Sequence, residues 1–98
     1  MLHIVNKSPL QSSTLDTVLR LAQSGALLLI EDAVYAATQG NAAVPKLRDA
    51  AARLKLYVLE PDLQARGVAD RVIDGVTKVD YGGFVDLVTE YPNSQSWL

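Results

Sequence analysis

Residues 26–30 read ALLLI, an apolar run that is followed at once by two acids, Glu31 and Asp32. A strand with one solvated face alternates apolar and polar residues. An unbroken apolar run therefore indicates a strand that is covered on both faces, as in the middle of a parallel sheet. The two acids mark the end of this strand and the start of a helix. They are also candidates for chemistry, because open α/β sheets bind ligands beyond the carboxyl ends of their strands.

Extended and helical patterns alternate on both sides of this run. Further strands are predicted at 1–6, 55–60 and 76–79, and helices at 12–25, 32–41, 44–54 and 80–92, with about one helical turn at 61–67. The first helix has apolar residues at i, i+3, i+4 and i+7, namely Leu15, Val18, Leu19 and Ala22. Ser13, Asp32 and Asp80 stand at expected helix N-caps, and Gly25 follows the first helix where a left-handed C-cap fits. The segment 68–75 shows no clear pattern.

The alternation favours a three-layer α/β/α fold with a mainly parallel sheet of four or five strands. The 98 residues are the size of one domain, so we expect a single domain over 1–98, with 92–98 as a C-terminal tail. Hydrophobic residues make up 49% of the chain, so part of the apolar surface is expected to face a partner. A sheet covered on both faces would also raise that share.

The composition argues against several kinds of function. The net charge is −2 and the nine Lys and Arg are scattered, so direct nucleic-acid binding is not expected. No apolar run approaches the roughly 18 residues that span a bilayer, and the N-terminus lacks a signal-peptide pattern. We therefore expect a cytoplasmic protein without membrane contact. The chain has no cysteine, so it offers neither a thiolate metal ligand nor a sulfur nucleophile.

Four acids fall at predicted strand ends: Glu31, Asp32, Glu60 and Asp80. Together they could bind Mg²⁺, which prefers carboxylate oxygens, so a stand-alone Mg²⁺-dependent enzyme stays open as an alternative. We favour capping roles for Asp32 and Asp80, because each stands where a helix N-cap is expected. The first strand also ends in Asn6 and Lys7 rather than in the two acids that a Mg²⁺-dependent receiver-like module would need. His3, the single histidine, is expected to be a hydrogen-bonded core residue. Without a phosphate-binding loop, a hydrolase elbow or a zinc ligand set, we expect no catalytic residue, metal or cofactor.

Two aromatic residues are candidates for contacts with another subunit. Tyr35 and Ala36 lie in an alanine-rich segment, where small side chains let another backbone approach and where tyrosine suits an interface. Trp97 and Leu98 end a polar tail, and tryptophan often anchors interfaces. Each feature also has an ordinary explanation, since the alanine-rich helix could pack on its own sheet and the tail could fold back. A homo-oligomeric ligand-binding module is a further alternative.

Five stretches together resemble the TusB/DsrH family: MLHIVNKSP at 1–9, LLLIEDAVYAA at 27–37, KLYVLEPDLQARG at 55–67, VDYGGFVDLVTEYP at 79–92 and SQSWL at 94–98. Their order and spacing carry the resemblance almost end to end, although no single stretch is a strong motif. Parts of the first, third and fourth stretches look closer to the DsrH branch. The resemblance implies a DsrEFH-like fold and membership of a heterohexamer with related TusC/DsrF-type and TusD/DsrE-type subunits. There, a TusD/DsrE-type cysteine would carry a persulfide and pass sulfur to a TusE/DsrC-type carrier, for tRNA wobble uridine 2-thiolation or for sulfur oxidation.

This chain lacks the group that such a relay needs. Sulfur moves by attack of one sulfur on another, which requires a thiolate. The position that matches the first-helix cysteine of some DsrH members is Val18, on the predicted apolar stripe, where a small apolar residue and a thiol can replace each other. We therefore interpret the chain as a non-catalytic subunit that supports a cysteine-bearing partner.

Overall fold

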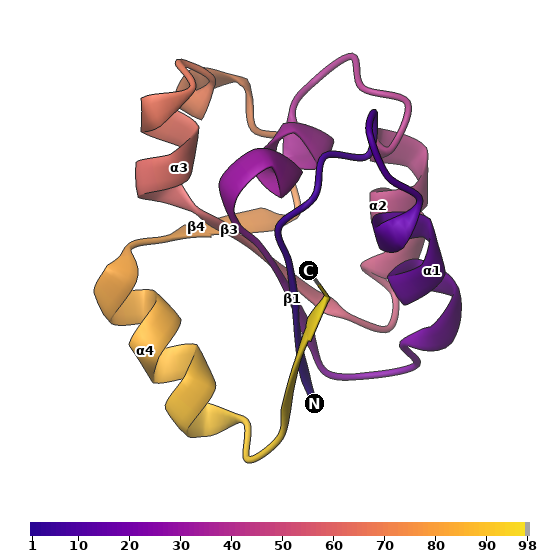
Figure 1. Ribbon diagram of the computed structural model, residues 1–98, viewed down its shortest axis with the longest axis vertical. Coiled ribbons are helices and arrows are strands. Elements are labelled where there is room, and N and C mark those ends of the chain that lie inside the picture. Colours follow the sequence, from indigo (N-terminus) through magenta and orange to yellow (C-terminus); the bar gives the residue numbers. More distant parts are fainter. Residues whose placement is uncertain (98) are drawn as a thin grey trace.

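A five-stranded sheet with helices on both faces forms the body of the protein, in a computed structural model that describes residues 1–97 (Figure 1). The strands are β1 (Leu2–Val5), β2 (Ala26–Leu29), β3 (Lys55–Leu59), β4 (Val76–Val79) and β5 (Ser94–Trp97). They lie in the order β4-β3-β2-β1-β5, and every neighbouring pair is parallel. The predicted α/β/α fold with a parallel sheet is confirmed.

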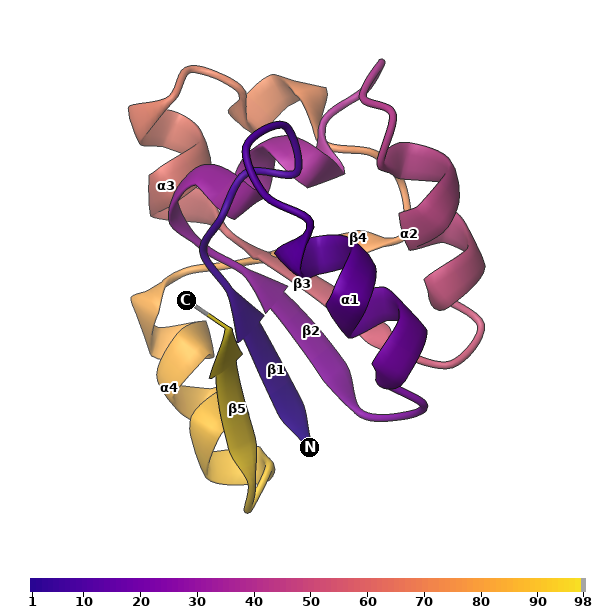
Figure 2. The ribbon, with the colours of Figure 1, turned by 45° about the vertical axis from the view of Figure 1, so that its right-hand side comes forward.

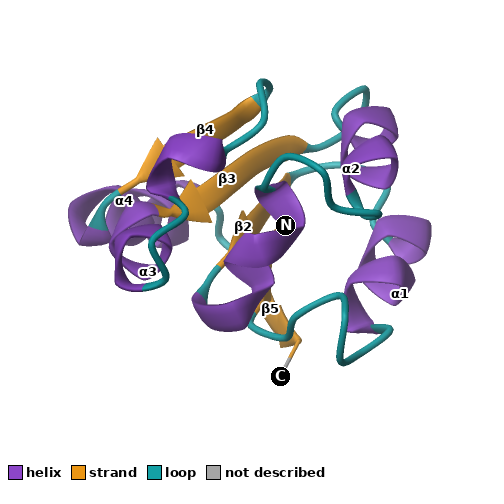
Figure 3. Cartoon of the chain, turned by 90° about the horizontal axis from the view of Figure 1, so that it is seen from above, coloured by secondary structure: helices purple, strands orange, loops and turns teal. Residues whose placement is uncertain are grey.

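The helices are α1 (Thr14–Leu21), α2 (Val44–Ala50), α3 (Glu60–Ala65) and α4 (Tyr81–Glu90), with two 3₁₀ helices, η1 (Glu31–Ala37) and η2 (Ala69–Arg71). Helices α1 and α2 cover one face of the sheet, and α4 lies on the other (Figures 2 and 3). Helix α3 packs against η1 beyond the carboxyl ends of the central strands. The sheet is therefore the middle layer of three.

Strand β2 contributes to two separate cores because successive side chains of a strand point to opposite faces. Leu27 and Leu29 join the larger cluster, under α1 and α2, while Ala26 and Leu28 join the smaller cluster, under α4. All four residues are essentially inaccessible to solvent. The prediction that this apolar run is covered on both faces is confirmed.

Strand β5 is the main difference from the sequence-based expectation. The sequence predicts a tail over 92–98, whereas residues 94–97 pair in parallel with β1, with Ser94 opposite Leu2 and Trp97 opposite Val5. Its first three residues are polar and exposed, so the strand has no apolar pattern that would reveal it. As an edge strand it is held chiefly by backbone pairing and by one aromatic side chain. Leu98 lies outside the described residues.

The helix in the alanine-rich segment ends earlier than predicted. The helix predicted at 32–41 is the 3₁₀ helix η1, which ends at Ala37. There the carbonyl of Ala37 accepts a hydrogen bond of 2.9 Å from the backbone N–H of Ile73. The segment 68–75, which has no clear sequence pattern, thus pairs with the chain after η1 and ends the helix early.

Of the three predicted N-caps, Asp80 is confirmed, whereas Ser13 and Asp32 are not. Asp80 caps α4, because its Oδ1 accepts a 2.8 Å hydrogen bond from the backbone N–H of Gly83. Ser13 occupies the N-cap position of α1, but its side chain makes no capping bond. Instead, the hydroxyl of Ser12 accepts a 3.2 Å bond from the N–H of Thr14.

Gly25 is needed for a different reason from the one predicted. Helix α1 ends at Leu21, so Gly25 is not its C-cap. The residue lies in the turn before β2 with φ +102°, and an added Cβ would come within 2.1 Å of the carbonyl oxygen of Met1. Both the left-handed backbone and the close approach of the N-terminal residue require glycine here.

Candidate functional site

Polar residues from three connections meet at the carboxyl ends of the strands. Asn6, which follows β1, donates a 3.1 Å hydrogen bond from Nδ2 to Oε2 of Glu31, which follows β2. The backbone N–H of Glu31 in turn donates a 2.6 Å bond to Oδ2 of Asp62, in the helix after β3. The sheet therefore brings polar side chains together at the edge where α/β proteins bind ligands, although not the set predicted.

Glu31 occupies a strained backbone conformation at this edge. Its φ is +50°, and within residues 1–97 it is the one non-glycine residue with a positive φ. Left-handed backbone is uncommon outside glycine and persists where the surroundings hold it. Here the Asp62 carboxylate accepts the hydrogen bond of the Glu31 N–H and so holds this conformation. The conformation turns the chain sharply from β2 into η1.

Asp32 does not cap a helix, and its carboxylate is engaged in an ion pair. Helix η1 begins one residue earlier, with Ile30 at its N-cap position, so the predicted capping role of Asp32 is wrong. Its Oδ1 instead accepts hydrogen bonds from Nε and Nη2 of Arg66, at 3.0 and 2.9 Å. The Asp32 side chain is 53% exposed, and pairs this exposed contribute about 0–1 kcal/mol.

Asp62 and Arg66 are the residues of this edge that the sequence analysis missed. Asp62 lies in α3 and Arg66 is its C-cap residue, four positions later, a spacing that places two side chains on one side of the helix. Arg66 also donates from Nη1 to the carbonyl of Asp62, at 3.2 Å. An acid and a base four positions apart, directly after a predicted strand, are the sequence signal that could have indicated them.

The remaining acids of the magnesium hypothesis lie in other interactions. Oε1 of Glu60 accepts a long, 3.5 Å hydrogen bond from Gln64, and Asp80 caps α4. Across residues 1–97, no three His, Cys, Asp or Glu side chains are grouped so that they could hold a metal ion. The geometry gives the Mg²⁺ hypothesis no ligand set.

A shallow cavity of about 330 Å³ lies beside this edge and is lined by Ser8, Leu10, Gln11, Asp32 and Tyr35. Tyr35 is half-buried, so part of its ring is available to a partner. Ala36 is fully buried, and its methyl group packs in the larger core. Of this predicted interface pair, Tyr35 stays a candidate, whereas Ala36 is turned inward and unavailable to another subunit.

His3 and Trp97 contact each other on neighbouring strands at the edge of the sheet. The indole Nε1–H donates to Nδ1 of His3 at 3.3 Å, and the rings are tilted, with their centroids 6.3 Å apart. His3 is buried, and this burial, together with the positive N-terminus, lowers its pKa below the usual value. A neutral imidazole is the form whose Nδ1 can accept the hydrogen bond from the indole N–H. Trp97 thus packs on its own domain, half-buried, and its interface role stays a prediction.

Val18 lies on the inner face of α1 and is fully buried in the larger core, which confirms its predicted burial. A side chain at this position has no contact with solvent. Val18, which the family resemblance matches to a cysteine of some DsrH members, is therefore a packing position in this chain.

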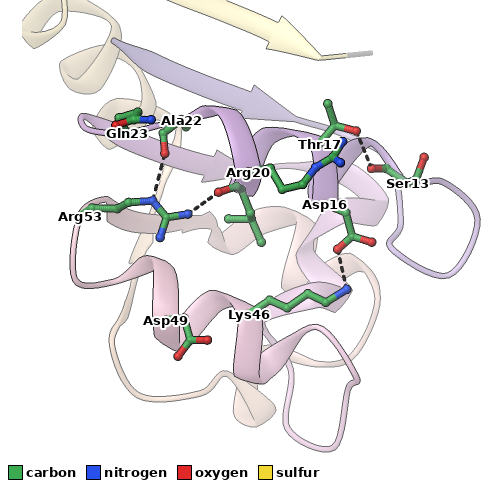
Figure 4. A pocket seen from close by; sticks show the side chains of 10 residues that line it. Ser13, Asp16, Thr17, Arg20, Ala22, Gln23, Lys46, Asp49 and Arg53 are labelled. Carbon is green, nitrogen blue, oxygen red and sulfur yellow. Dashed lines mark hydrogen bonds and ion pairs between the residues drawn. The ribbon is translucent and has the colours of Figure 1, made fainter.

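A larger cavity of about 840 Å³ lies between α1 and α2 (Figure 4). Two of its cations hold the helices together. Lys46 pairs with Asp16 at 2.8 Å. Arg53 donates from Nε to the carbonyl of Ala22, at 3.1 Å, and from Nη2 to the carbonyl of Leu19. These carbonyls lie at the end of α1, where they have no partner inside the helix. We therefore interpret the cavity as a structural gap between two packed helices.

In the part of the chain that the structure describes, no helix is both long enough and apolar enough to cross a membrane.

Comparisons with known proteins agree on one family. The model of the DsrH family, described as DsrH like protein, matches residues 7–94. Protein TusB of Pectobacterium parmentieri is 40% identical over 98 residues, covering 99% of this chain and 100% of the relative. Protein TusB of Salmonella dublin is 40% identical over 100 residues, with the same coverage.

A solved structure shows the same fold. The crystal structure of the ychN protein from E. coli has a TM-score of 0.80 at 21% identity, covering 98% of this chain and 97% of that one. This likeness shows a common fold. Because the family model spans most of the chain and the TusB relatives match it over their full length, this protein belongs to the TusB/DsrH family.

Proposed function

We propose that this chain is a non-catalytic subunit of a sulfur-relay complex of the TusBCD/DsrEFH type. The observation that carries the proposal is the absence of cysteine from a member of this family. A sulfur relay requires a thiolate, and the chain has none to offer. It therefore acts by shaping and stabilising a partner that carries one.

In the proposed complex, TusC/DsrF-type and TusD/DsrE-type subunits are the partners of this chain, in a cytoplasmic heterohexamer. A cysteine of the TusD/DsrE-type subunit holds the sulfur as a persulfide. The thiolate of a TusE/DsrC-type carrier attacks the outer sulfur of that persulfide. The sulfur–sulfur bond breaks, the subunit's cysteine leaves as a thiolate, and the carrier now holds the persulfide. No external oxidant or reductant is needed for this exchange.

Two destinations for the sulfur fit the family. The TusB relatives favour 2-thiolation of the wobble uridine of tRNA. The DsrH-like stretches of the sequence favour oxidation of stored sulfur. The relay step is the same chemistry in both cases, so the proposal about this subunit is independent of the destination.

The proposal is tested by loading the reconstituted complex with sulfur and measuring each subunit by mass spectrometry. We expect the mass increment of one sulfur atom on the TusD/DsrE-type subunit and none on this chain. A complex in which the partner's reactive cysteine is replaced by serine is the control, and it should carry no labile sulfur.

The supporting role is tested separately by measuring sulfur transfer to the carrier with this chain present and absent. We expect transfer to slow by roughly tenfold or more without it, because correct positioning of reacting groups supplies much of the rate. Transfer at full speed without this chain would refute the supporting role.

A further inference from the structure

Strand β5 is attached to the sheet by few contacts. It pairs with β1 along one edge only, and its first three residues are polar and exposed (Figure 2). Where the strand begins, the carbonyl of Asn93 accepts a 3.0 Å hydrogen bond from the backbone N–H of Leu2. Of residues 94–97, only Trp97 packs against a hydrophobic core. Segments with few buried contacts open locally before the rest of a fold does, so β5 is a candidate for such opening.

The side chains of Trp97 and His3 join the end of β5 to the middle of β1. Leu2 and Ile4 belong to the smaller core, so alternation along β1 places His3 on the opposite face of the sheet. That face carries the larger core, which Trp97 also contacts. The indole Nε1–H donates to Nδ1 of His3 at 3.3 Å. Because the indole nitrogen can only donate, the contact requires an imidazole nitrogen that accepts.

Protonation of His3 removes that acceptor. A neutral imidazole has a lone pair on one ring nitrogen, whereas an imidazolium carries a proton on each of its two nitrogens. The proton comes from water, and no other covalent bond is made or broken. The Nδ1–H of the imidazolium then points at the indole N–H, and two donors that face each other repel. The hydrogen bond is therefore lost and the two rings separate.

The surroundings of His3 offer the imidazolium no compensating charge. Its neighbours across the sheet are Leu27 of β2 and Gln95 of β5, both uncharged. The residues of α1 that join the larger core are apolar, and the charged residues of that helix, Asp16 and Arg20, are exposed. Within residues 1–97, no carboxylate forms an ion pair with His3. Burial, and after it the N-terminal ammonium group, lower the pKa of His3.

Release of β5 offers the protonated ring a better environment. His3 is buried while Trp97 lies against it, and its ring gains contact with water when the strand leaves. The pKa of His3 is thus lower with β5 attached than with β5 released, where it returns toward about 6.5. Attachment is therefore independent of pH well above that value. Below it, attachment weakens by at most about tenfold per pH unit, because the released state binds the proton more readily.

We propose that the His3–Trp97 contact, which we call the latch, is opened by acid: protonation of His3 raises the population of a state in which β5 has left β1 while the other four strands stay paired. Helix α4 need not follow, because residues 91–93 separate it from β5 and Leu87 anchors it in the smaller core. Release uncovers the backbone edge of β1, and an uncovered edge can pair with another chain. The inference is independent of the proposed function.

The first test is an NMR titration of the full chain. The sequence has one histidine and one tryptophan, so each ring gives a single signal of its kind. We expect the His3 ring to titrate with a midpoint below about 6.5, and the indole N–H signal of Trp97 to shift with the same midpoint. A His3 midpoint at or above the ordinary value would overturn the proposal, since attachment would then not oppose protonation.

Hydrogen exchange measures the release itself, with protection factors that correct for the intrinsic effect of pH. We expect the protection of the β5 amides to fall by roughly tenfold to thirtyfold between about pH 7.5 and about pH 5. The amides of β2, in the middle of the sheet, should stay protected at least roughly a hundredfold more than those of β5. If β5 and β2 amides are equally protected, β5 opens only when the whole chain unfolds and the latch does not exist.

Two variants separate the latch from a general effect of acid. In His3→Gln, the amide oxygen can accept the indole hydrogen bond but does not titrate, so we expect β5 protection to be the same at both pH values. Trp97→Phe keeps an aromatic ring but removes the donor. We expect weaker β5 protection at neutral pH and a smaller change with acid. A fall in β5 protection as large in both variants as in the wild type would overturn the proposal.

Discussion

Replacing Val18 with cysteine introduces a thiol at the position that the family resemblance matches to a cysteine, and the structure predicts that this thiol is inert. Val18 is fully buried on the inner face of α1. Valine and cysteine are close in size, so the change removes about one methyl group from the core. We expect the free energy of unfolding to fall by about 1 kcal/mol. For a domain of this size, Tm should then fall by about 4–8 °C.

The reactivity of the new thiol follows from its burial. A reagent can reach it only when α1 moves away from the sheet, and apolar surroundings also disfavour the reactive thiolate. If this local opening costs about 4 kcal/mol, the reaction slows by roughly a thousandfold, since each 1.4 kcal/mol is about a factor of ten. The thiol should react at full speed once denaturant unfolds the chain.

The assay follows the colour released by an aromatic disulfide reagent, in native buffer and in denaturant. Leu21→Cys is the control on the same helix, because Leu21 is 62% exposed. We expect the control to react as fast as a small free thiol in both solutions. If Val18→Cys reacts in native buffer as fast as Leu21→Cys, position 18 is open to solvent. The view of it as a packing position would then be wrong.

Three further predictions concern stability. Asp80→Ala removes the N-cap of α4 and should lower the free energy of unfolding by about 1 kcal/mol in urea titrations, whereas exposed Asp74→Ala should leave it unchanged. Gly25→Ala should destabilise far more than Gly75→Ala in thermal unfolding: both have positive φ, but a Cβ at Gly75 meets open space while one at Gly25 meets backbone. The pKa of His3 is lowered in the folded state, so its stabilising effect is complete above the unfolded pKa of about 6.5 and is lost as pH falls toward the folded value. His3→Gln should flatten the dependence of unfolding midpoints on pH below about 6.5, and a slope equal to that of the wild type would contradict this reasoning.

Local patterns in the sequence determined which segments are covered and how helix α4 begins. The run at 26–30 has no polar side chain, and a strand of that kind must be buried on both faces wherever it lies. The stripe that contains Val18 and the cap at Asp80 likewise depend on residues a few positions apart. The family could be recognised for a related reason, since the order of several short stretches is visible without any structure.

Contacts between distant segments were decided only by the tertiary structure. Strand β5 is polar, and its place beside β1 depends on backbone hydrogen bonds, which the side-chain pattern does not encode. Asp32 pairs with Arg66, and the Glu31 N–H with Asp62, because the connections after β2 and β3 meet at one edge of the sheet. Helical spacing shows that α4 has an apolar surface, yet it cannot tell a side that packs on its own sheet from one that stays exposed. That distinction depends on how much area the sheet offers to a single helix, which is a property of the assembled fold.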